Sequence, residues 1–293
     1  MYNEISQLPL VQQSRQGKVR DIYDLGETLL IVSTDRISAF DVVFPTLIPD
    51  KGKILNAISV YFFNTTKDIV PNHFITANIS EYPVELQRFG EYLEERSMLV
   101  KKTRVIPFEC IVRGYISGSA WKEYKKSNTI GGMLIAEEMQ ESQKFPHPLF
   151  TPSTKAEKGH DENISYREFM SRMDEPLAVY IKDKSLELYS YAHDLLLKKG
   201  IILADTKFEF GTISSEVLLI DELFTPDSSR LWSLEDYEMG KSPKSYDKQF
   251  IRDYLENSGW DKQSPPPPLP EEVIEQTRQK YLTILKIITG KEL

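Results

Sequence analysis

The chain has 293 residues, of which 40% are hydrophobic and 27% charged, and a formal net charge of -8 at pH 7. This length exceeds what one hydrophobic core usually serves, so two lobes are expected. The negative charge argues against non-specific binding to nucleic acid or to an anionic membrane, so an anionic ligand must meet a local group of cations. A single cysteine, Cys110, excludes an intrachain disulfide and a cysteine zinc site.

The first residues lack the basic and apolar regions of a signal peptide. No apolar run approaches the roughly 18 residues needed to cross a bilayer. We therefore expect a cytoplasmic protein whose partners include neither nucleic acid nor a membrane. A monomer is compatible with this composition.

Strands are predicted in the first part of the chain, over residues 19–23, 29–32 and 41–48. Residues 54–69 have helical spacing of apolar side chains, and residues 98–112 return to an extended pattern interrupted by Pro107. We take residues 1–107 as a strand-rich N-terminal lobe.

Helices dominate the second part and are predicted over residues 166–173, 176–199, 247–257 and 270–289. Ser165 and Glu168 form a capping box before the first of them, and the proline run at 265–270 predicts a stiff spacer before the last. Residues 108–293, including these C-terminal helices, are expected to form a mixed lobe. The fold class is α+β, with the ligand in a cleft between the two lobes.

The most informative segment is a predicted hairpin whose strands span residues 201–211 and 216–223, with a turn near Ser214 and Ser215. Side chains alternate along a strand, so three charged residues share one surface. These residues are Asp205, Lys207 and Glu209.

The same turn would place Asp221 opposite Glu209. Two carboxylates that close repel each other unless a cation lies between them, and Mg²⁺ accepts one or two carboxylates together with water and phosphate oxygens. The alternative is a solvated charged face on an edge hairpin. Because the neighbouring residues are apolar, we expect instead that the charges line a cleft.

Other polar segments lie in loops or at strand ends. GKVRD at 17–21 combines a glycine with two cations and could approach a phosphate, although a Gly-Lys pair taken alone is more often a turn with a solvated lysine. RGYISGS at 113–119 offers a forked guanidinium with glycines and hydroxyls, which suits an anionic group. The polar stretch 151–165 reads as a substrate loop or as disorder.

Together these segments resemble the family of phosphoribosylaminoimidazole-succinocarboxamide synthases, also called SAICAR synthetases, over nearly the whole chain. The two most specific matches are IPFECIVRGYISGS at 106–119 and LADTKFEFG at 203–211. GKVRDIY at 17–23, STDRISAFD at 33–41, KGHDENIS at 158–165 and DELFTPDSSRLW at 221–232 are similar to further family blocks. Ser117 departs from the threonine or alanine that is common at its position.

The resemblance implies an ATP-dependent ligase that converts carboxyaminoimidazole ribonucleotide and L-aspartate to SAICAR, ADP and phosphate. It implies Mg²⁺ as cofactor, ATP as co-substrate, and a SAICAR synthase-like fold related to the ATP-grasp enzymes. The expected mechanism is phosphorylation of the imidazole carboxylate followed by attack of the aspartate amine.

The resemblance also implies site residues, by the motifs in which they stand. The metal ligands would be Glu209 and Asp221. The catalytic residues would be Lys207, Asp205, which would orient Lys207 or a hydrated ion, and Asp161, a hypothetical base. The ATP-binding residues would be Gly17, Lys18, Val19, Arg20, Val100, Lys102 and Glu109. The substrate-binding residues would be Asp35, Ser38, Asp41, Arg113, Ser119, Lys155 and Arg230.

Two alternatives share these residues. An ATP-dependent small-molecule kinase would stop at the phosphorylated substrate, and a non-catalytic nucleotide sensor would release no ADP. The sensor is disfavoured because it has no physical reason to retain so many costly charges.

Overall fold

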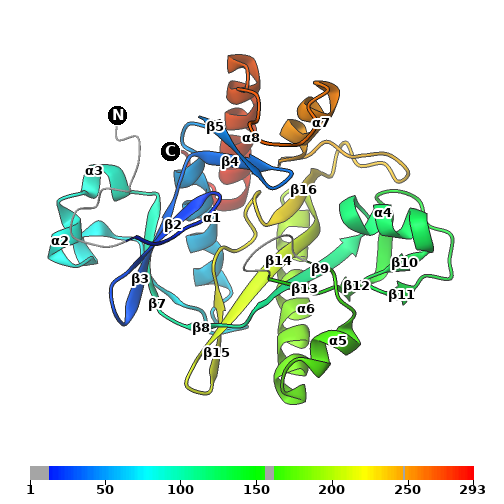
Figure 1. Ribbon diagram of the computed structural model, residues 1–293, viewed down its shortest axis with the longest axis horizontal. Coiled ribbons are helices and arrows are strands. Elements are labelled where there is room, and N and C mark those ends of the chain that lie inside the picture. The colour runs from blue at the N-terminus through cyan, green and yellow to red at the C-terminus, as the bar shows by residue number, and fades with distance from the viewer. Residues whose placement is uncertain (1–12, 156–161, 247) are drawn as a thin grey trace. The chain divides into compact units, whose positions relative to one another are not determined.

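The computed structural model describes residues 13–155, 162–246 and 248–293, and these form two compact units (Figure 1). Of the described residues, the first unit takes those up to Thr65, Asn72–Thr103, and those from Tyr246 onward. The second unit takes Thr66–Pro71 and Arg104–Ser245.

The first unit contains a five-stranded antiparallel sheet in the order β1-β2-β3-β7-β6 and a separate two-stranded hairpin of β4 and β5. Alternating apolar residues build this sheet, since Tyr23, Leu30, Val32 and Leu99 meet in one buried cluster. The strands are β1 (Gln13–Gln16), β2 (Arg20–Asp24), β3 (Thr28–Ser33), β4 (Arg36–Ala39), β5 (Val42–Leu47), β6 (Phe74–Thr76) and β7 (Ser97–Lys101).

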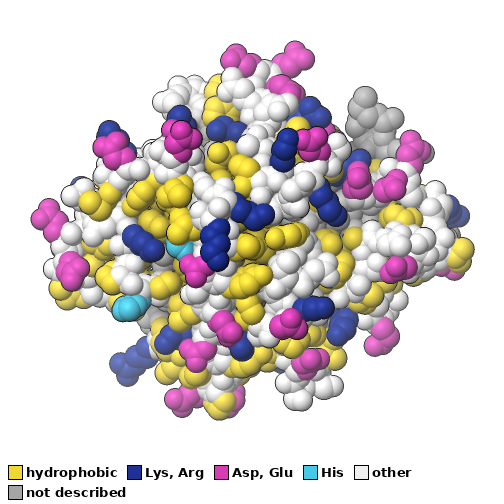
Figure 2. All heavy atoms as spheres, turned by 180° about the vertical axis from the view of Figure 1, so that it is seen from behind, with side chains coloured by type: hydrophobic (Ala, Val, Ile, Leu, Met, Phe, Trp, Pro, Cys, Tyr) yellow, Lys and Arg dark blue, Asp and Glu magenta, His cyan; other side chains and the backbone are white. Residues whose placement is uncertain are grey.

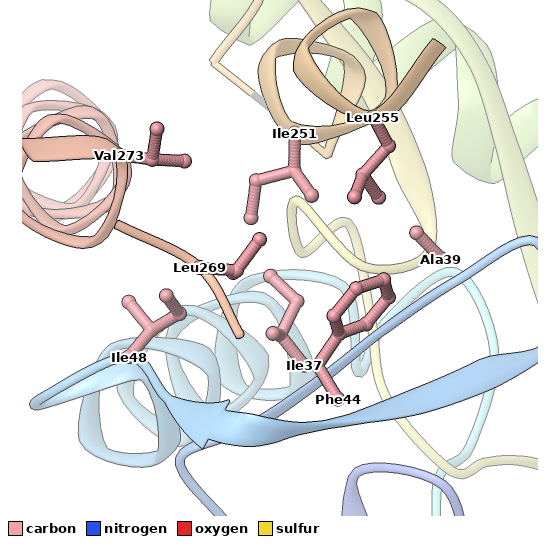
Figure 3. Close-up of a cluster of buried hydrophobic side chains, with 8 residues drawn as sticks. All are labelled: Ile37, Ala39, Phe44, Ile48, Ile251, Leu255, Leu269 and Val273. Carbon is pink, nitrogen blue, oxygen red and sulfur yellow. The ribbon is translucent and has the colours of Figure 1, made fainter. Parts of the chain in front are cut away.

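Helix α1 of the first unit packs against β3, β7 and helix α8. Figure 3 shows how the two C-terminal helices close a second cluster, with Ile251 and Leu255 of α7 directed toward Ile37 and Phe44 of the hairpin. The helices are α1 (Lys51–Thr65), the 3-10 helix η1 (Ile79–Glu81), α2 (Val84–Gln87), α3 (Gly90–Leu93), α7 (Gln249–Asn257) and α8 (Glu271–Thr289).

The second unit is built on a seven-stranded antiparallel sheet whose central strands are β9 and β14. The sheet follows the path β12-β9-β14-β15, while β13 pairs with β9, and β8 and β16 pair with β14. A small hairpin of β10 and β11 lies apart from it. The strands are β8 (Arg104–Val105), β9 (Phe108–Tyr115), β10 (Thr129–Ile130), β11 (Met133–Leu134), β12 (Lys144–Phe150), β13 (Ser153–Thr154), β14 (Ile201–Ile213), β15 (Glu216–Ile220) and β16 (Ser229–Ser233).

In the described part of the second unit the helices are α4 (Gly118–Ser127), α5 (Tyr166–Ser171) and α6 (Glu175–Leu197). The long helix α6 packs on β14, β9 and β12, which fixes the central strands against a rigid support. Its proline-led start and the left-handed Gly200 beyond its end agree with the sequence prediction. Ser165 is confirmed as the N-cap of α5, because its hydroxyl accepts a hydrogen bond from the amide of Glu168.

The two units differ from the division expected at residue 107. That division assigned the C-terminal helices to the second lobe, whereas α7 and α8 bury their apolar faces in the first unit. Residues 66–71 belong to the second unit, where the carbonyl of Pro71 accepts a hydrogen bond from the amide of Leu219.

Figure 2 shows acidic and basic side chains scattered among hydrophobic ones over one face of the molecule. Charge on this face is therefore mixed in sign, and a site for an anionic ligand depends on a local arrangement of cations. Among the residues that the structure describes, no helix is long and apolar enough to cross a bilayer.

Candidate active site

The register of β9 and β14 aligns two rows of functional side chains on the central strands of the second unit. Asp205 lies opposite Arg113, and Lys207 lies opposite Ile111. Side chains alternate along each strand, so Glu109 and Glu209 continue the same two rows. The sheet thus gathers on one face charged residues that are about a hundred positions apart in sequence.

Asp205 joins two arginines at one end of these rows. Its carboxylate accepts hydrogen bonds from Nη1 of Arg230 at 2.6 Å and from Nη1 of Arg113 at 3.3 Å. Arg113 also donates from Nε to the hydroxyl of Thr151 at 2.9 Å and from Nη2 to the hydroxyl of Ser119 at 3.2 Å. Burial lowers the pKa of Arg113, and the carboxylate of Asp205 opposes that effect. The arginine side chains are therefore fixed in place before any ligand arrives.

The N-terminus of α4 lies beside the two arginines. A Cβ atom at Gly118, whose φ is +55°, would stand 2.1 Å from Nη2 of Arg230. Only glycine allows this approach, and the hydroxyl of Ser117 reaches the carboxylate of Asp205 at 3.4 Å. Two guanidinium groups, a hydroxyl and a helix N-terminus converge here, which is an arrangement suited to a phosphate.

A second group of charges occupies the other end of the rows. Nζ of Lys207 donates to Oε1 of Glu109 at 2.5 Å, and Lys155 is paired with Glu209. Burial acts to lower the pKa of Lys207, but the carboxylates of Glu109, Glu209 and Asp221 outweigh it and raise that pKa. Lys207 is therefore held as a cation throughout the neutral range.

Glu209 and Asp221 are close enough to influence each other. Burial raises the pKa of Glu209, and the negative charge of Asp221 raises it further, while Lys155 and Lys207 oppose the rise. The predicted register was wrong by one residue, because the two-residue loop of Ser214 and Ser215 sets Ile220 opposite Glu209. Asp221 follows β15 directly and has φ of +72°, so the chain turns at that residue.

The chemistry of this carboxylate pair fits Mg²⁺. The two carboxylates repel in a buried place, so a divalent ion between them would relieve both the repulsion and the cost of burial. Within the described ranges, no group of three or more His, Cys, Asp and Glu side chains is arranged to hold a metal ion. Two protein carboxylates with remaining positions for water and phosphate oxygens is the coordination that Mg²⁺ usually takes.

Lys155 also borders a pocket of about 700 Å³. Its walls combine the apolar side chains of Ile106 and Phe108 with the cations Arg104 and Arg172. The amide of Lys155 donates to the carbonyl of Pro107, and its ammonium pairs with Glu209.

The predicted phosphate loop lies in the first unit, just before β2. The amide of Gly17 donates to the carbonyl of Arg20 at 2.7 Å, and a Cβ at position 17 would lie 2.9 Å from that oxygen. The turn thus requires the small residue that the sequence provides. Lys18 is exposed and forms an ion pair with Asp41.

Asp35, Ser38 and Asp41 are spread over three environments. Asp35 accepts a hydrogen bond from the amide of Gly52 at 2.8 Å and pairs with Arg96 at 3.2 Å, so it supports the start of α1. Ser38 is buried in the β4–β5 hairpin, and Asp41 lies in the turn of that hairpin with φ of +65°. Their predicted contact with substrate remains a prediction.

Two other predicted residues have contacts that bear on their roles. Val100 is buried in β7, between β3 and β6, and the expectation that the backbone around it contacts adenine stays a prediction. Lys102 lies beyond the strand and donates from Nζ to Asp24 at 2.6 Å. The predicted base, Asp161, falls outside the described residues.

The contacts of Asp205 and Glu109 differ from those that the sequence suggested. Asp205 was expected to orient Lys207 or a hydrated ion. Its carboxylate pairs with Arg113 and Arg230, while the ammonium of Lys207 pairs with Glu109. The signal that could have indicated Glu109 is the alternation on β9, where Glu109, Ile111 and Arg113 share a face. Thr151 was not anticipated, because its contact depends on the pairing of β12 with β9.

Paired arginines, two carboxylates and two lysines on or beside one antiparallel sheet are typical of an enzyme that acts on anionic substrates. The comparisons with known proteins name its family. The family model described as SAICAR synthetase matches residues 13–267. The chain is 54% identical over 280 residues to the phosphoribosylaminoimidazole-succinocarboxamide synthase of Thermodesulfovibrio yellowstonii, covering 96% of each protein.

Solved structures agree with this result. The SAICAR synthase of Saccharomyces cerevisiae complexed with SAICAR superposes with a TM-score of 0.91 at 40% identity, over 100% of this chain and 99% of that one. A SAICAR synthetase (Type-2) in complex with ADP shares the fold, with a TM-score of 0.68 at 23% identity over 95% of this chain and 98% of that one. The chain belongs to the SAICAR synthetase family, whose fold is ATP-grasp-like. It is therefore an enzyme, a ligase of purine biosynthesis.

Proposed function

We propose that this enzyme joins L-aspartate to carboxyaminoimidazole ribonucleotide at the expense of ATP, giving SAICAR, ADP and phosphate. The observation that carries the proposal is the pair of charged groups on β9 and β14 in a member of this family. One group, centred on Asp205, suits a phosphate, and the other, centred on Glu209, suits a metal ion and the reacting carboxylate.

The reaction proceeds in two steps. An oxygen of the imidazole carboxylate attacks the terminal phosphorus of ATP, the bond to the bridging oxygen breaks, and ADP leaves. The amine of aspartate then attacks the acyl carbon, phosphate departs, and the nitrogen loses a proton. Much of the rate can come from holding the amine and the acyl phosphate together.

Lys207 would place its positive charge beside the carboxylate that becomes phosphorylated. Glu109 supports this role because it holds the ammonium in position. Lys155 would contact the L-aspartate substrate. Its ion pair with Glu209 would then be replaced by contacts with the ligands. Arg113, Ser119 and Arg230 would bind the 5′-phosphate of the ribonucleotide, which is a task for forked donors.

Glu209 and Asp221 would hold Mg²⁺. When bound, the ion neutralises phosphate charge that would otherwise oppose the approach of the carboxylate. The loop of Gly17, Lys18, Val19 and Arg20 would contact the phosphates of ATP. ADP in the fold-level relative supports the same nucleotide class.

Neither the kinase nor the sensor alternative finds support in the comparisons. A cytoplasmic location and a monomeric state are part of the proposal.

The test is release of ADP from Mg²⁺-ATP and carboxyaminoimidazole ribonucleotide, with and without L-aspartate, together with the mass of the product. We expect ADP only when aspartate is present, with the succinocarboxamide as product. ADP without aspartate would indicate a kinase, and no ADP would indicate a sensor or a different substrate.

A further inference from the structure

Arg36, at the start of β4, donates hydrogen bonds to the loop of Gly17 and Lys18 that precedes β2. Its Nη2 donates to the carbonyl of Gly17 at 3.1 Å, and its Nε donates to the carbonyl of Lys18 at 3.3 Å. The next carbonyl, that of Val19, accepts from both the amide of Thr34 at 3.0 Å and its hydroxyl at 2.8 Å. Three consecutive carbonyls are therefore held by the segment that joins β3 to β4.

Arg36 is itself anchored. Asp21 accepts from Nη2 at 2.7 Å and from Nη1 at 3.1 Å, so the two side chains form a forked pair. The Asp21 side chain is only 2% exposed and that of Arg36 20%. A forked pair of this kind fixes the guanidinium plane, which a lysine in the same place could not do.

Because the peptide bond is planar, the hydrogen bonds from Arg36 to these carbonyls also set the direction of the neighbouring amides. In a trans peptide the C=O and the following N–H point in opposite directions. Arg36 donates hydrogen bonds to the carbonyls of Gly17 and Lys18. The amides of Lys18 and Val19 therefore point away from Arg36. Within residues 13–155, 162–246 and 248–293, neither of these two amides donates a hydrogen bond. Two adjacent amides turned outward form a concavity that favours an anion.

We propose that Arg36, anchored by Asp21, is a positioning residue that keeps the amides of Lys18 and Val19 directed at the phosphates of the bound nucleotide. The inference rests on the proposed function, which places ATP phosphates at this loop. Arg36 acts through the backbone and does not itself touch the substrate.

The test compares Arg36→Met and Arg36→Lys with Arg278→Met as a matched control. Arg278, on α8 of the same unit, also places two donors on an aspartate, because its Nη2 and Nε donate to Oδ2 of Asp50 at 2.6 and 2.9 Å. Binding of ADP by calorimetry, KM for ATP, KM for the ribonucleotide and thermal stability are measured for each protein. We expect both Arg36 variants to weaken ADP binding and to raise KM for ATP about ten-fold, the equivalent of one to two lost hydrogen bonds.

KM for the ribonucleotide should stay within about two-fold of the parent value, and Arg278→Met should lower the melting temperature without changing either KM. Arg36→Lys keeps the charge beside Asp21, so it is the variant expected to fold if Arg36→Met does not. Unchanged ADP binding in a folded Arg36 variant overturns the inference, and so does an equal rise in both KM values. If the parent protein itself fails to bind ADP, the proposed function fails instead.

Discussion

Arg230 donates a 2.6 Å hydrogen bond to Asp205. This contact indicates that Asp205 positions arginine side chains and not Lys207, its near neighbour in sequence. Asp205 also binds Arg113 and lies deep in the sheet. A buried carboxylate between two guanidinium groups removes part of their desolvation cost and sets the angle between them. The phosphate site that we propose is thereby arranged before a ligand binds.

The first prediction concerns Asp205→Asn. The amide keeps the shape of the side chain but loses its charge, so the arginines are held less firmly. We expect KM for the ribonucleotide to rise about ten-fold with a smaller change in kcat, since one charge-assisted contact is weakened on each arginine. Steady-state kinetics at saturating ATP and aspartate measure both constants. Asp236→Asn, which removes an exposed partner of Lys244, is the control. A large loss of kcat at constant KM would favour the original expectation, in which Asp205 orients Lys207.

The second prediction concerns the metal. Glu209→Gln keeps the size of the side chain and removes one of two carboxylates, so the Mg²⁺ concentration giving half-maximal activity should rise about ten-fold or more. Glu216→Gln, an exposed change on the same hairpin, should leave it unaltered. Activity lost on chelation should return with added Mg²⁺ in the parent protein. An unaltered Mg²⁺ requirement in Glu209→Gln would exclude that residue as a ligand.

Local patterns predicted much of this fold. The strand β14 was predicted from its period-two alternation of polar and apolar residues. The helix α6 was predicted from an amphipathic run between a proline and a glycine. The turn at Ser214 and Ser215 was also predicted. Its loop length sets the register of the hairpin, so Ile220 and not Asp221 lies opposite Glu209.

Longer-range features were not readable from one sequence. The pairing of Lys207 with Glu109 depends on which strand lies beside β14, and nothing local specifies that neighbour. Helix α4 was not predicted, because its sequence, GSAWKEYKKS, begins at a glycine and buries only Ala120 and Tyr124. The C-terminal helices show the same dependence, since their apolar faces match the β4–β5 hairpin more than 200 residues earlier.

The third prediction concerns His193, which is buried on α6 between the rings of Tyr115 and Tyr189. Burial lowers its pKa, with Lys144 contributing, while Asp194 opposes the shift. Below about pH 6.5 the unfolded chain takes up a proton that the folded chain excludes, so stability falls as the pH drops toward the folded pKa.

Replacing His193 with glutamine removes this proton uptake. The free energy of unfolding, measured by urea denaturation between about pH 5 and pH 7, should therefore fall less steeply in His193→Gln than in the parent. His147→Gln is the control because His147 is exposed on β12. Parallel pH profiles for His193→Gln and the parent would show that His193 makes no contribution in this range.

The fourth prediction separates backbone strain from steric conflict at Gly118. Alanine there must adopt φ of +55° and would also place its Cβ 2.1 Å from Nη2 of Arg230. Gly259→Ala is the matched control, since Gly259 has φ of +75° with no atom within 4 Å of the added Cβ. Strain alone costs about 1 kcal/mol of stability in either variant. Gly118→Ala should in addition displace the guanidinium and raise KM for the ribonucleotide about ten-fold or more, because the phosphate site needs that group in place. If both variants lose stability equally and neither changes KM, Arg230 can shift without cost and the close packing at Gly118 does not hold it in position.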